Sequence, residues 1–267
     1  MGVETAISWA DHTFNPWWGC VKVSPACTHC YAETFSKRVG VKVWGIDSPR
    51  RFFGRKHWEE PLKWNERAQK DGVRRRVFCA SMADVFEDRD DLKQARADLF
   101  LTIEETPDLD WLLLTKRPEN IAQMLPRWSH MNGRPFRNVW LGTTVESDDY
   151  RDRIRHLVEV DAVVHFVSYE PALGPLNLEP WLDVDDTGRT AQIDWVIAGG
   201  ESGGHARASN PEWFLAVRDQ CAAASVPFHF KQWGEWIYPI RVGKKAAGRS
   251  LEGREWLDFP TPKEFVR

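Results

Sequence analysis

The chain has 267 residues and a formal net charge of −3, with 42% hydrophobic and 28% charged residues. This length suits a large α/β domain with a sizeable core. The near-neutral charge argues against a strongly basic coat for nucleic acid but leaves room for a local basic face. No segment reaches the roughly 18 consecutive apolar residues of a membrane span, and the first residues lack the regions of a secretory signal. We therefore expect a cytoplasmic protein with no membrane partner.

Short apolar runs recur along the chain, each bounded by polar or turn residues. Their length and their content of Val, Ile, Phe and Trp are typical of buried strands. The predicted strands are Ala6–Trp9, Val77–Ala80, Trp111–Leu114, Val139–Leu141, Val163–Val167, Trp195–Ala198 and Phe228–Phe230.

Segments of helical length and periodicity separate the later strands. The predicted helices are Asp91–Glu105, Pro118–Leu125, Asp148–Val158 and Pro211–Ala224, the last with Asn210 as its N-cap. Alternation of strand and helix is the pattern of parallel sheets covered by helices. The predicted fold is therefore α/β, a full or partial (βα) barrel of parallel strands.

We interpret residues 1–267 as a single barrel-like domain with three less regular parts. Residues 41–71 are basic and aromatic, and we expect them to form an irregular insertion. Residues 183–192 are predicted to form a polar loop, and residues 234–267 an irregular C-terminal extension. Fifteen tryptophans against four tyrosines predict many indoles in the core or around a cavity, where they can also stack on bases or adenine.

Three of the five cysteines fall within eleven residues, at Cys20, Cys27 and Cys30. Clustered thiols in a chain without a secretory signal indicate metal or redox chemistry in a reducing compartment. Cys27 and Cys30 have the spacing of a chelating pair, and the loop that begins at Gly19 can fold back to add Cys20. Because the loop follows the first predicted strand, it belongs to the carboxyl end of the barrel, where barrel enzymes place their chemistry.

The remaining ligands distinguish two kinds of metal site. No fourth cysteine is near, because Cys79 and Cys221 lie in apolar runs. Three thiolates leave one iron of an iron–sulfur cluster open to a ligand, whereas His12 or His29 would complete a zinc site. The favoured reading is the cluster, the alternative is a non-catalytic zinc-stapled domain that binds nucleic acid or protein, and a thiol-redox enzyme is a third possibility that needs only Cys27 and Cys30.

The sequence around these cysteines resembles the phage-type three-Cys-motif proteins, a radical-SAM-like group. The resemblance rests on Thr13–Pro16, Gly19–Cys20, Ser24–Glu33, Cys79–Phe86, Leu114–Pro118, Trp140–Glu146, Ser168–Pro171 and Gly199–Gly203. It implies a [4Fe–4S] cluster on the three cysteines, S-adenosylmethionine (SAM) as cofactor, an electron donor and a possible partner protein. The spacing differs from the usual radical SAM pattern, with six residues between Cys20 and Cys27 where three are usual, and His29 precedes the last cysteine.

Polar or small residues follow each of the later predicted strands. Because parallel strands end at one edge of the sheet, these residues are expected to surround the cysteine loop. The candidate cofactor-binding residues are Ser81, Asp84, Thr115, Lys116, Thr143, Glu146, Glu170, Gly199, Gly200 and Glu201. The resemblance further implies Ser81 and Asp84 near the methionine part of SAM, and Thr143, Glu146 and Glu201 near its ribose.

The segment Arg50–Trp58 mixes arginines with aromatic residues, as nucleic-acid contacts do. A solvated basic loop packed over the barrel would have the same composition. The expected substrate is a nucleic acid or a nucleotide. The candidate substrate-binding residues are Arg50, Arg51, Arg55, Arg117 and Lys231.

Overall fold

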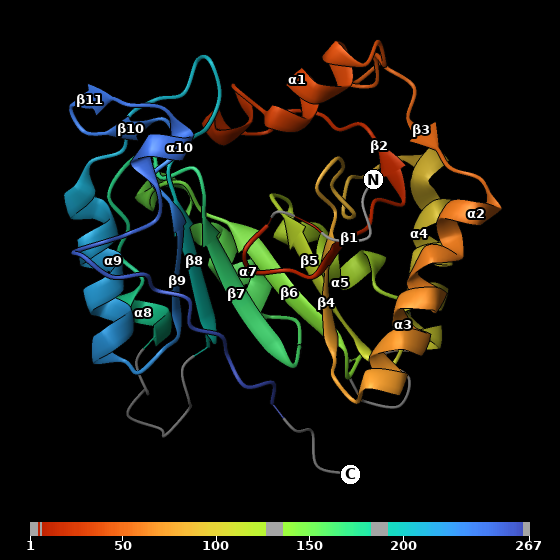
Figure 1. Ribbon diagram of the computed structural model, residues 1–267. Helices are drawn as coiled ribbons and strands as arrows, with labels where there is room; N and C mark the ends of the chain where they lie inside the picture. The colour runs from red at the N-terminus through yellow and green to blue at the C-terminus, as the bar shows by residue number, and fades with distance from the viewer. Residues whose placement is uncertain (1–4, 6, 127–135, 183–191, 264–267) are drawn as a thin grey trace.

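The computed structural model describes residues 5, 7–126, 136–182 and 192–263. Its centre is a seven-stranded sheet in the order β1-β4-β5-β6-β7-β8-β9, with every neighbouring pair parallel. The strands are β1 (His12–Thr13), β4 (Arg75–Cys79), β5 (Leu109–Thr115), β6 (Val139–Thr144), β7 (Val164–Tyr169), β8 (Trp195–Gly199) and β9 (Phe228–Gln232). Each strand lies beside the next one in the chain, and the sheet curls into a half-barrel (Figure 1). This confirms the α/β class and the partial form of the barrel.

Helices cover the outer face of the sheet (Figure 1). The longer ones are α3 (Glu60–Asp71), α4 (Lys93–Glu105), α7 (Asp152–Val158) and α9 (Pro211–Ala223), and the short ones on this side are α2 (Arg55–Trp58), α5 (Ile121–Met124) and α8 (Glu179–Leu182). The four predicted helices are present, and the Asn210 side chain accepts a hydrogen bond from the Glu212 amide, as the predicted N-cap should. None of the helices in the described ranges has the length and apolar character of a bilayer span.

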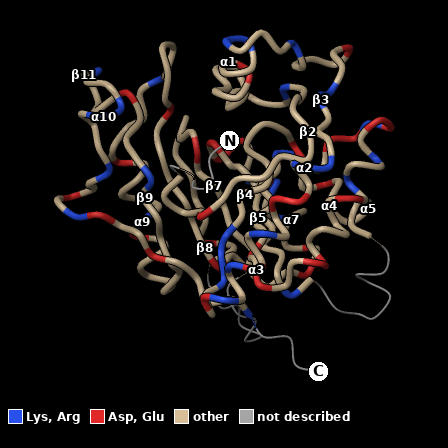
Figure 2. Tube along the Cα trace, turned by 45° about the vertical axis from the view of Figure 1, so that its right-hand side comes forward, with Lys and Arg blue, Asp and Glu red and all other residues tan. Residues whose placement is uncertain are grey.

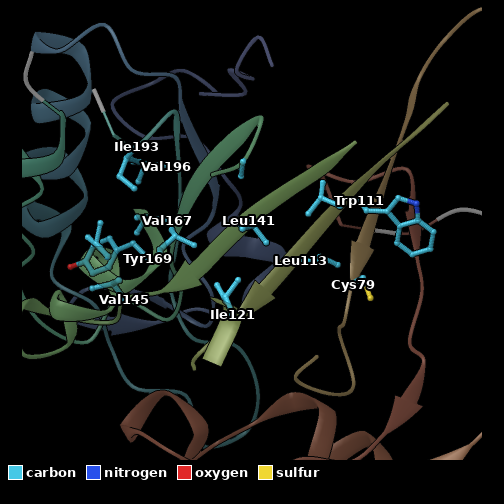
Figure 3. Packing of buried hydrophobic residues seen from close by; sticks show 14 of the residues in the cluster. Cys79, Trp111, Leu113, Ile121, Leu141, Val145, Val167, Tyr169, Ile193 and Val196 are labelled. Carbon is cyan, nitrogen blue, oxygen red and sulfur yellow. The ribbon is translucent and has the colours of Figure 1, made fainter. Parts of the chain in front are cut away.

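The two faces of the sheet bury different side chains, because successive residues of a strand point to opposite faces. On the outer face, aliphatic residues such as Leu113, Leu141 and Val167 belong to one buried cluster, whose side chains Figure 3 shows along the strands. The inner face is aromatic near the starts of the strands, where Trp140 and Trp195 pack together. The barrel interior is therefore filled at one end by large rings.

The first strand is shorter and later than predicted. The predicted strand was Ala6–Trp9, whereas β1 is His12–Thr13 and pairs with Val77 and Phe78 of β4. Trp9 packs instead on the inner face, 4.6 Å from the ring of Phe78. The apolar run correctly indicated that Trp9 is buried. Trp9 is buried because its side chain fills the interior of the half-barrel, and not because it lies in a strand.

The segment 41–71 is more regular than predicted. β3 (Arg51–Phe52) pairs antiparallel with β2 (Trp17–Trp18), and the segment ends in the twelve-residue helix α3. Pro61 starts this helix and the left-handed Gly72 ends it, as these residues commonly do. The charged residues of its exposed face obscured the three buried positions, Pro61, Trp64 and Ala68, of which Trp64 and Ala68 pack in the core.

The C-terminal part forms a hairpin and then returns over the inner face. The hairpin joins β10 (Trp236–Ile237) to β11 (Ile240–Arg241), and α10 (Lys244–Ala247) follows. Further on, the Phe259 ring lies 5.2 Å from that of Trp195, which closes the aromatic cluster. The extension thus contributes to the core. Most of the polar loop predicted at 183–192 lies outside the described residues.

Candidate metal centre

The cysteine loop crosses the carboxyl ends of the strands and brings its three thiols to one cavity. The 3-10 helix η1 (Pro25–Cys27) ends at Cys27, and Cys30 directly precedes α1 (Tyr31–Arg38). All three cysteines are free and line a cavity of about 180 Å³. That is roughly ten times the space a single water needs, so the cavity has room for a small group. The structure therefore brings together the thiols that the sequence singled out.

Cys20 rests on a buried ion pair. The Arg117 guanidinium lies 3.7 Å from the Cys20 sulfur and 2.8 Å from an Asp84 carboxylate oxygen. Asp84 also accepts hydrogen bonds from the Thr115 hydroxyl at 2.6 Å and the Lys116 amide at 3.1 Å. Burial raises the pKa of the Cys20 thiol to about 12, and Arg117 opposes that shift. A metal would therefore have to displace a firmly held proton.

Two glutamates predicted to bind cofactor hold the cysteine loop instead. Glu146, only 1% exposed, accepts hydrogen bonds from the Arg153 guanidinium at 2.8 Å and from the Ala26 amide at 3.4 Å. Ala26 lies in the loop, next to Cys27. Because both carboxylate oxygens already have partners within the protein, Glu146 braces the loop and is not presented to the cavity.

Glu201 acts in the same way from the end of β8. It accepts hydrogen bonds from the guanidinium of Arg207 at 2.6 and 2.8 Å and lies 3.3 Å from His29 Nδ1. Burial disfavours the Glu201 charge, but the hydrogen bonds from Arg207 and His29 hold its pKa below the usual value. Arg207 also donates to the Pro25 carbonyl at 3.0 Å, so this ion pair anchors the loop that carries Cys27.

The two glycines after β8 are required by close packing. A Cβ on Gly199 would lie 2.9 Å from a carboxylate oxygen of Glu170, and one on Gly200 would lie 1.9 Å from the Trp233 carbonyl oxygen. Glu170 in turn pairs with Lys231 at 2.8 Å. Glu170 and Lys231 both line the cavity, whereas the glycines make room for protein groups.

The polar wall of the cavity partly matches the prediction. Lining the cavity are the predicted residues Ser81, Asp84, Thr115, Lys116, Arg117, Glu170 and Lys231, together with Tyr31, Thr144 and Ser168. Thr143 does not line it, because its hydroxyl donates to the Thr115 carbonyl. Strand alternation could have identified Thr144 in its place, since Thr144 shares the inner face with Trp140.

The arginines of the basic insertion differ in exposure: Arg50 is buried, whereas Arg51 and Arg55 are exposed. Arg50 is 5% exposed, pairs with Glu87, and donates to the carbonyls of Val43 and Ser48. The proposed nucleic-acid contact by Arg50 is therefore corrected: it fixes the fold of its own loop. Arg51 lies over the Trp18 ring and Arg55 pairs with Glu59 at the surface. Figure 2 shows basic and acidic residues interspersed along the chain.

Neither histidine considered for a zinc site lines the cysteine cavity. His12 stacks on Trp64, with ring centroids 4.4 Å apart, and His29 is held by Glu201. Within the part of the chain that the structure describes, no three His, Cys, Asp or Glu side chains are placed to hold one metal ion. The three sulfurs thus share a cavity that neither of these histidines lines.

Fold and site together define an α/β half-barrel protein with a thiol-lined cavity at the carboxyl ends of its strands. The chain belongs to the DUF5131 family, described as a protein of unknown function, whose family model matches residues 4–260. Comparison with curated proteins and with solved structures found no match.

Proposed function

We propose that the protein is a radical SAM-type enzyme that holds an iron–sulfur cluster on Cys20, Cys27 and Cys30. The observation that carries this proposal is the meeting of three free thiols, without a fourth, at one cavity above the strand ends. Thiolates are the usual ligands of iron–sulfur clusters. Three of them satisfy three irons of a cubane and leave the fourth for a cofactor.

The donor set favours a cluster over a structural zinc ion, because such a zinc site takes four ligands, whereas three thiols line the cavity and neither His12 nor His29 does. A zinc ion needs its sulfur ligands at about 2.3 Å from one point, and the described residues do not offer three His, Cys, Asp or Glu groups in that arrangement. A cluster takes each thiolate at a different iron, so its ligands belong further apart. The donor set and the shared cavity therefore suit the cluster.

With one electron from an external donor, a cluster and SAM bound here would supply methionine and a deoxyadenosyl radical, which takes hydrogen from a substrate. In this chain, Lys116 is a cation suited to the SAM carboxylate, and Glu170 is an acid suited to its ammonium group. The hydroxyls of Thr144 and Ser168 suit the ribose. Asp84, Glu146 and Glu201 act as positioning residues, because they hold Arg117 and the cysteine loop in place.

The cavity floor contributes exclusion of water. Trp9, Phe78 and Leu114 line the cavity from the inner face of the sheet, and the first two belong to the aromatic cluster that fills the interior below. A closed apolar floor leaves the loop side as the entrance. Reactive groups in the cavity would then be shielded on the side of the sheet.

The proposed reaction is tested by product formation after anaerobic reconstitution with iron and sulfide. We expect deoxyadenosine and methionine in equal amounts from SAM and a strong reductant, measured by liquid chromatography and mass spectrometry. Cys27→Ala should abolish both products, whereas Cys221→Ala, in the outer core, should retain them. A reconstituted protein that holds zinc in stoichiometric amount, has no cluster absorption and forms no deoxyadenosine would support the zinc-stapled domain instead.

A further inference from the structure

A second hollow lies beside the cysteine cavity, between the start of α1 and the loop after β8, which run close together in Figure 1. We call it the α1 groove; its volume is about 320 Å³. One side is formed by residues between His29 and Arg38, and the other by the loop from Ser202 to His205. Tyr31 lines both the α1 groove and the cysteine cavity, so a ligand in one reaches the edge of the other.

The loop that lines the α1 groove carries two backbone amides for which the described residues provide no partner. Arg241 on β11 donates to the carbonyl oxygens of Gly203 at 3.0 Å and Gly204 at 2.9 Å. Because C=O and N–H of a trans peptide point in opposite directions, the amides of Gly204 and His205 point away from Arg241. Neither amide has a hydrogen-bond partner among the described residues. Successive free amides of this kind form a concave site for an anion.

The side chains around these amides are also suited to an anion. Arg38 is exposed at the edge of the groove, and the imidazole rings of His29 and His205 lie 5.9 Å apart. Two carboxylates contact groove residues: Glu235 accepts a hydrogen bond from the Gly203 amide at 3.1 Å, and Glu201, which is 6% exposed, is paired with Arg207 and His29. Glu201 is therefore compensated, and Arg38 is the cation that an anion entering the groove would meet.

Aromatic faces complete the α1 groove. Tyr31 is 58% exposed, yet its hydroxyl is fixed by a 2.8 Å hydrogen bond to the Ser81 carbonyl. Phe35 lies beside it, with the Arg38 guanidinium 5.2 Å above the ring. A tyrosine held at its tip and bare on its face is a platform on which a base can stack, worth about 1–3 kcal/mol per base.

From this pairing of an anion site with a stacking platform, we infer that the α1 groove binds a phosphorylated nucleoside. Its phosphate lies against the amides of Gly204 and His205, and its base against Tyr31. Because Tyr31 follows Cys30 and borders the cysteine cavity, the bound nucleoside would face that cavity. That this nucleoside is the substrate rests on the proposed function, whereas its binding in the groove does not depend on that function.

The test is nucleotide binding to the full-length protein, measured by calorimetry before and after cluster reconstitution. The probes are AMP and a short single-stranded oligonucleotide, with adenosine and inorganic phosphate as partial ligands. We expect AMP, the oligonucleotide or both to bind more tightly than either partial ligand. Binding of AMP identifies a free nucleotide, and binding of the oligonucleotide alone identifies a strand, whose affinity should fall with salt.

Variants that introduce a negative charge localise the binding. Arg38→Glu and His205→Asp should each weaken it by about tenfold or more, as expected for losing a charge-assisted contact. Arg67→Glu is the matched control, because Arg67 is an exposed arginine on α3 that does not line the groove. Arg38 is exposed as well, so its variant should fold, which thermal unfolding would verify.

Several results would overturn the assignment. They are no binding of either nucleotide probe, equal affinity for inorganic phosphate and AMP, and equal loss of binding in Arg67→Glu and Arg38→Glu. Nucleotide binding without deoxyadenosine formation would leave the groove assigned and remove the proposed reaction. Deoxyadenosine formation without nucleotide binding would do the opposite.

Discussion

The two ends of the inner sheet face differ in what they hold. Toward the starts of the strands the face is closed by rings, whereas toward their ends it carries small or polar groups around the thiols. Strand β6 shows the change over three inward positions, from Trp140 through Gly142 to Thr144, and β7 runs from Phe166 to Ser168. The tryptophans therefore close one end of the half-barrel and leave the other end for binding.

The sealed end should be broken most severely by truncating its central ring. Trp195 is fully buried, and its ring lies 5.2 to 6.4 Å from those of Phe259, Phe166, Trp140, His229 and Trp9. We expect Trp195→Ala to lower the free energy of unfolding by about 4 kcal/mol, measured by chemical denaturation. Leu101→Ala, at a 48% exposed position on α4, should change it by about 0.5 kcal/mol or less. Similar losses in both variants would remove the special role of the aromatic cluster.

At the open end, the largest effect should come from Arg117. Its side chain and that of Asp84 are 10% and 8% exposed, at 2.8 Å, so Arg117→Met leaves a buried carboxylate without its cation. We expect a loss of about 3 kcal/mol in unfolding free energy, together with reduced iron uptake because Cys20 loses its neighbour. Arg75→Met, which breaks a partly exposed pair with Asp71, should cost about 0.5 kcal/mol. An Arg117→Met protein of unchanged stability and iron content would contradict this account.

His229 makes the sealed end sensitive to acid. Burial first, and then the charges of Lys231, Arg76 and Arg249, lower its pKa to about 4. The folded protein therefore holds His229 neutral, and the stability this contributes is present above the unfolded pKa of about 6.5 and is lost as pH falls towards 4.

The His229 effect is measured as the difference between two proteins. Between pH 7 and 4 we expect the wild-type protein to lose about 3 kcal/mol more unfolding free energy than His229→Gln. The substitution keeps a polar group near the Ser8 hydroxyl, which lies 2.9 Å from His229 Nε2 in the parent. Parallel pH profiles for the two proteins would show that His229 is not responsible.

The smallest expected loss of stability comes from Gly142, which lies between the aromatic end and the polar end of the inner face. A Cβ on Gly142 would lie 2.3 to 2.5 Å from atoms of the Phe166 ring, so Gly142→Ala should cost about 2 kcal/mol by overpacking. Gly54→Ala, where a Cβ meets nothing within 4 Å, should be close to neutral. Combining Gly142→Ala with Phe166→Leu should recover part of the loss; no recovery would mean that the ring is not the cause.

The sequence predicted the sheet better than the site. Buried strands in a parallel sheet are continuous apolar runs, so their positions were readable, and only β1 was displaced because Trp9 is buried without being in a strand. The cysteines were readable from their spacing. The sequence did not show which acidic residues line the cavity. Glu146 and Glu201 pair with Arg153 and Arg207, and no spacing relative to the cysteines indicates these pairings. The burial of Arg50 was not predicted. A charged residue is rarely buried unless it is paired, and the partner of Arg50, Glu87, is 37 residues away in the sequence.

The central claim concerns the three thiols, and metal content tests it most directly. After anaerobic reconstitution we expect about four irons and as many sulfides per chain in the wild-type protein and in Cys221→Ala. Cys20→Ala, Cys27→Ala and Cys30→Ala should each lose most of that iron. If the three loop variants retain iron to the same extent as Cys221→Ala, the thiols at this cavity do not hold a cluster and the proposed function is wrong.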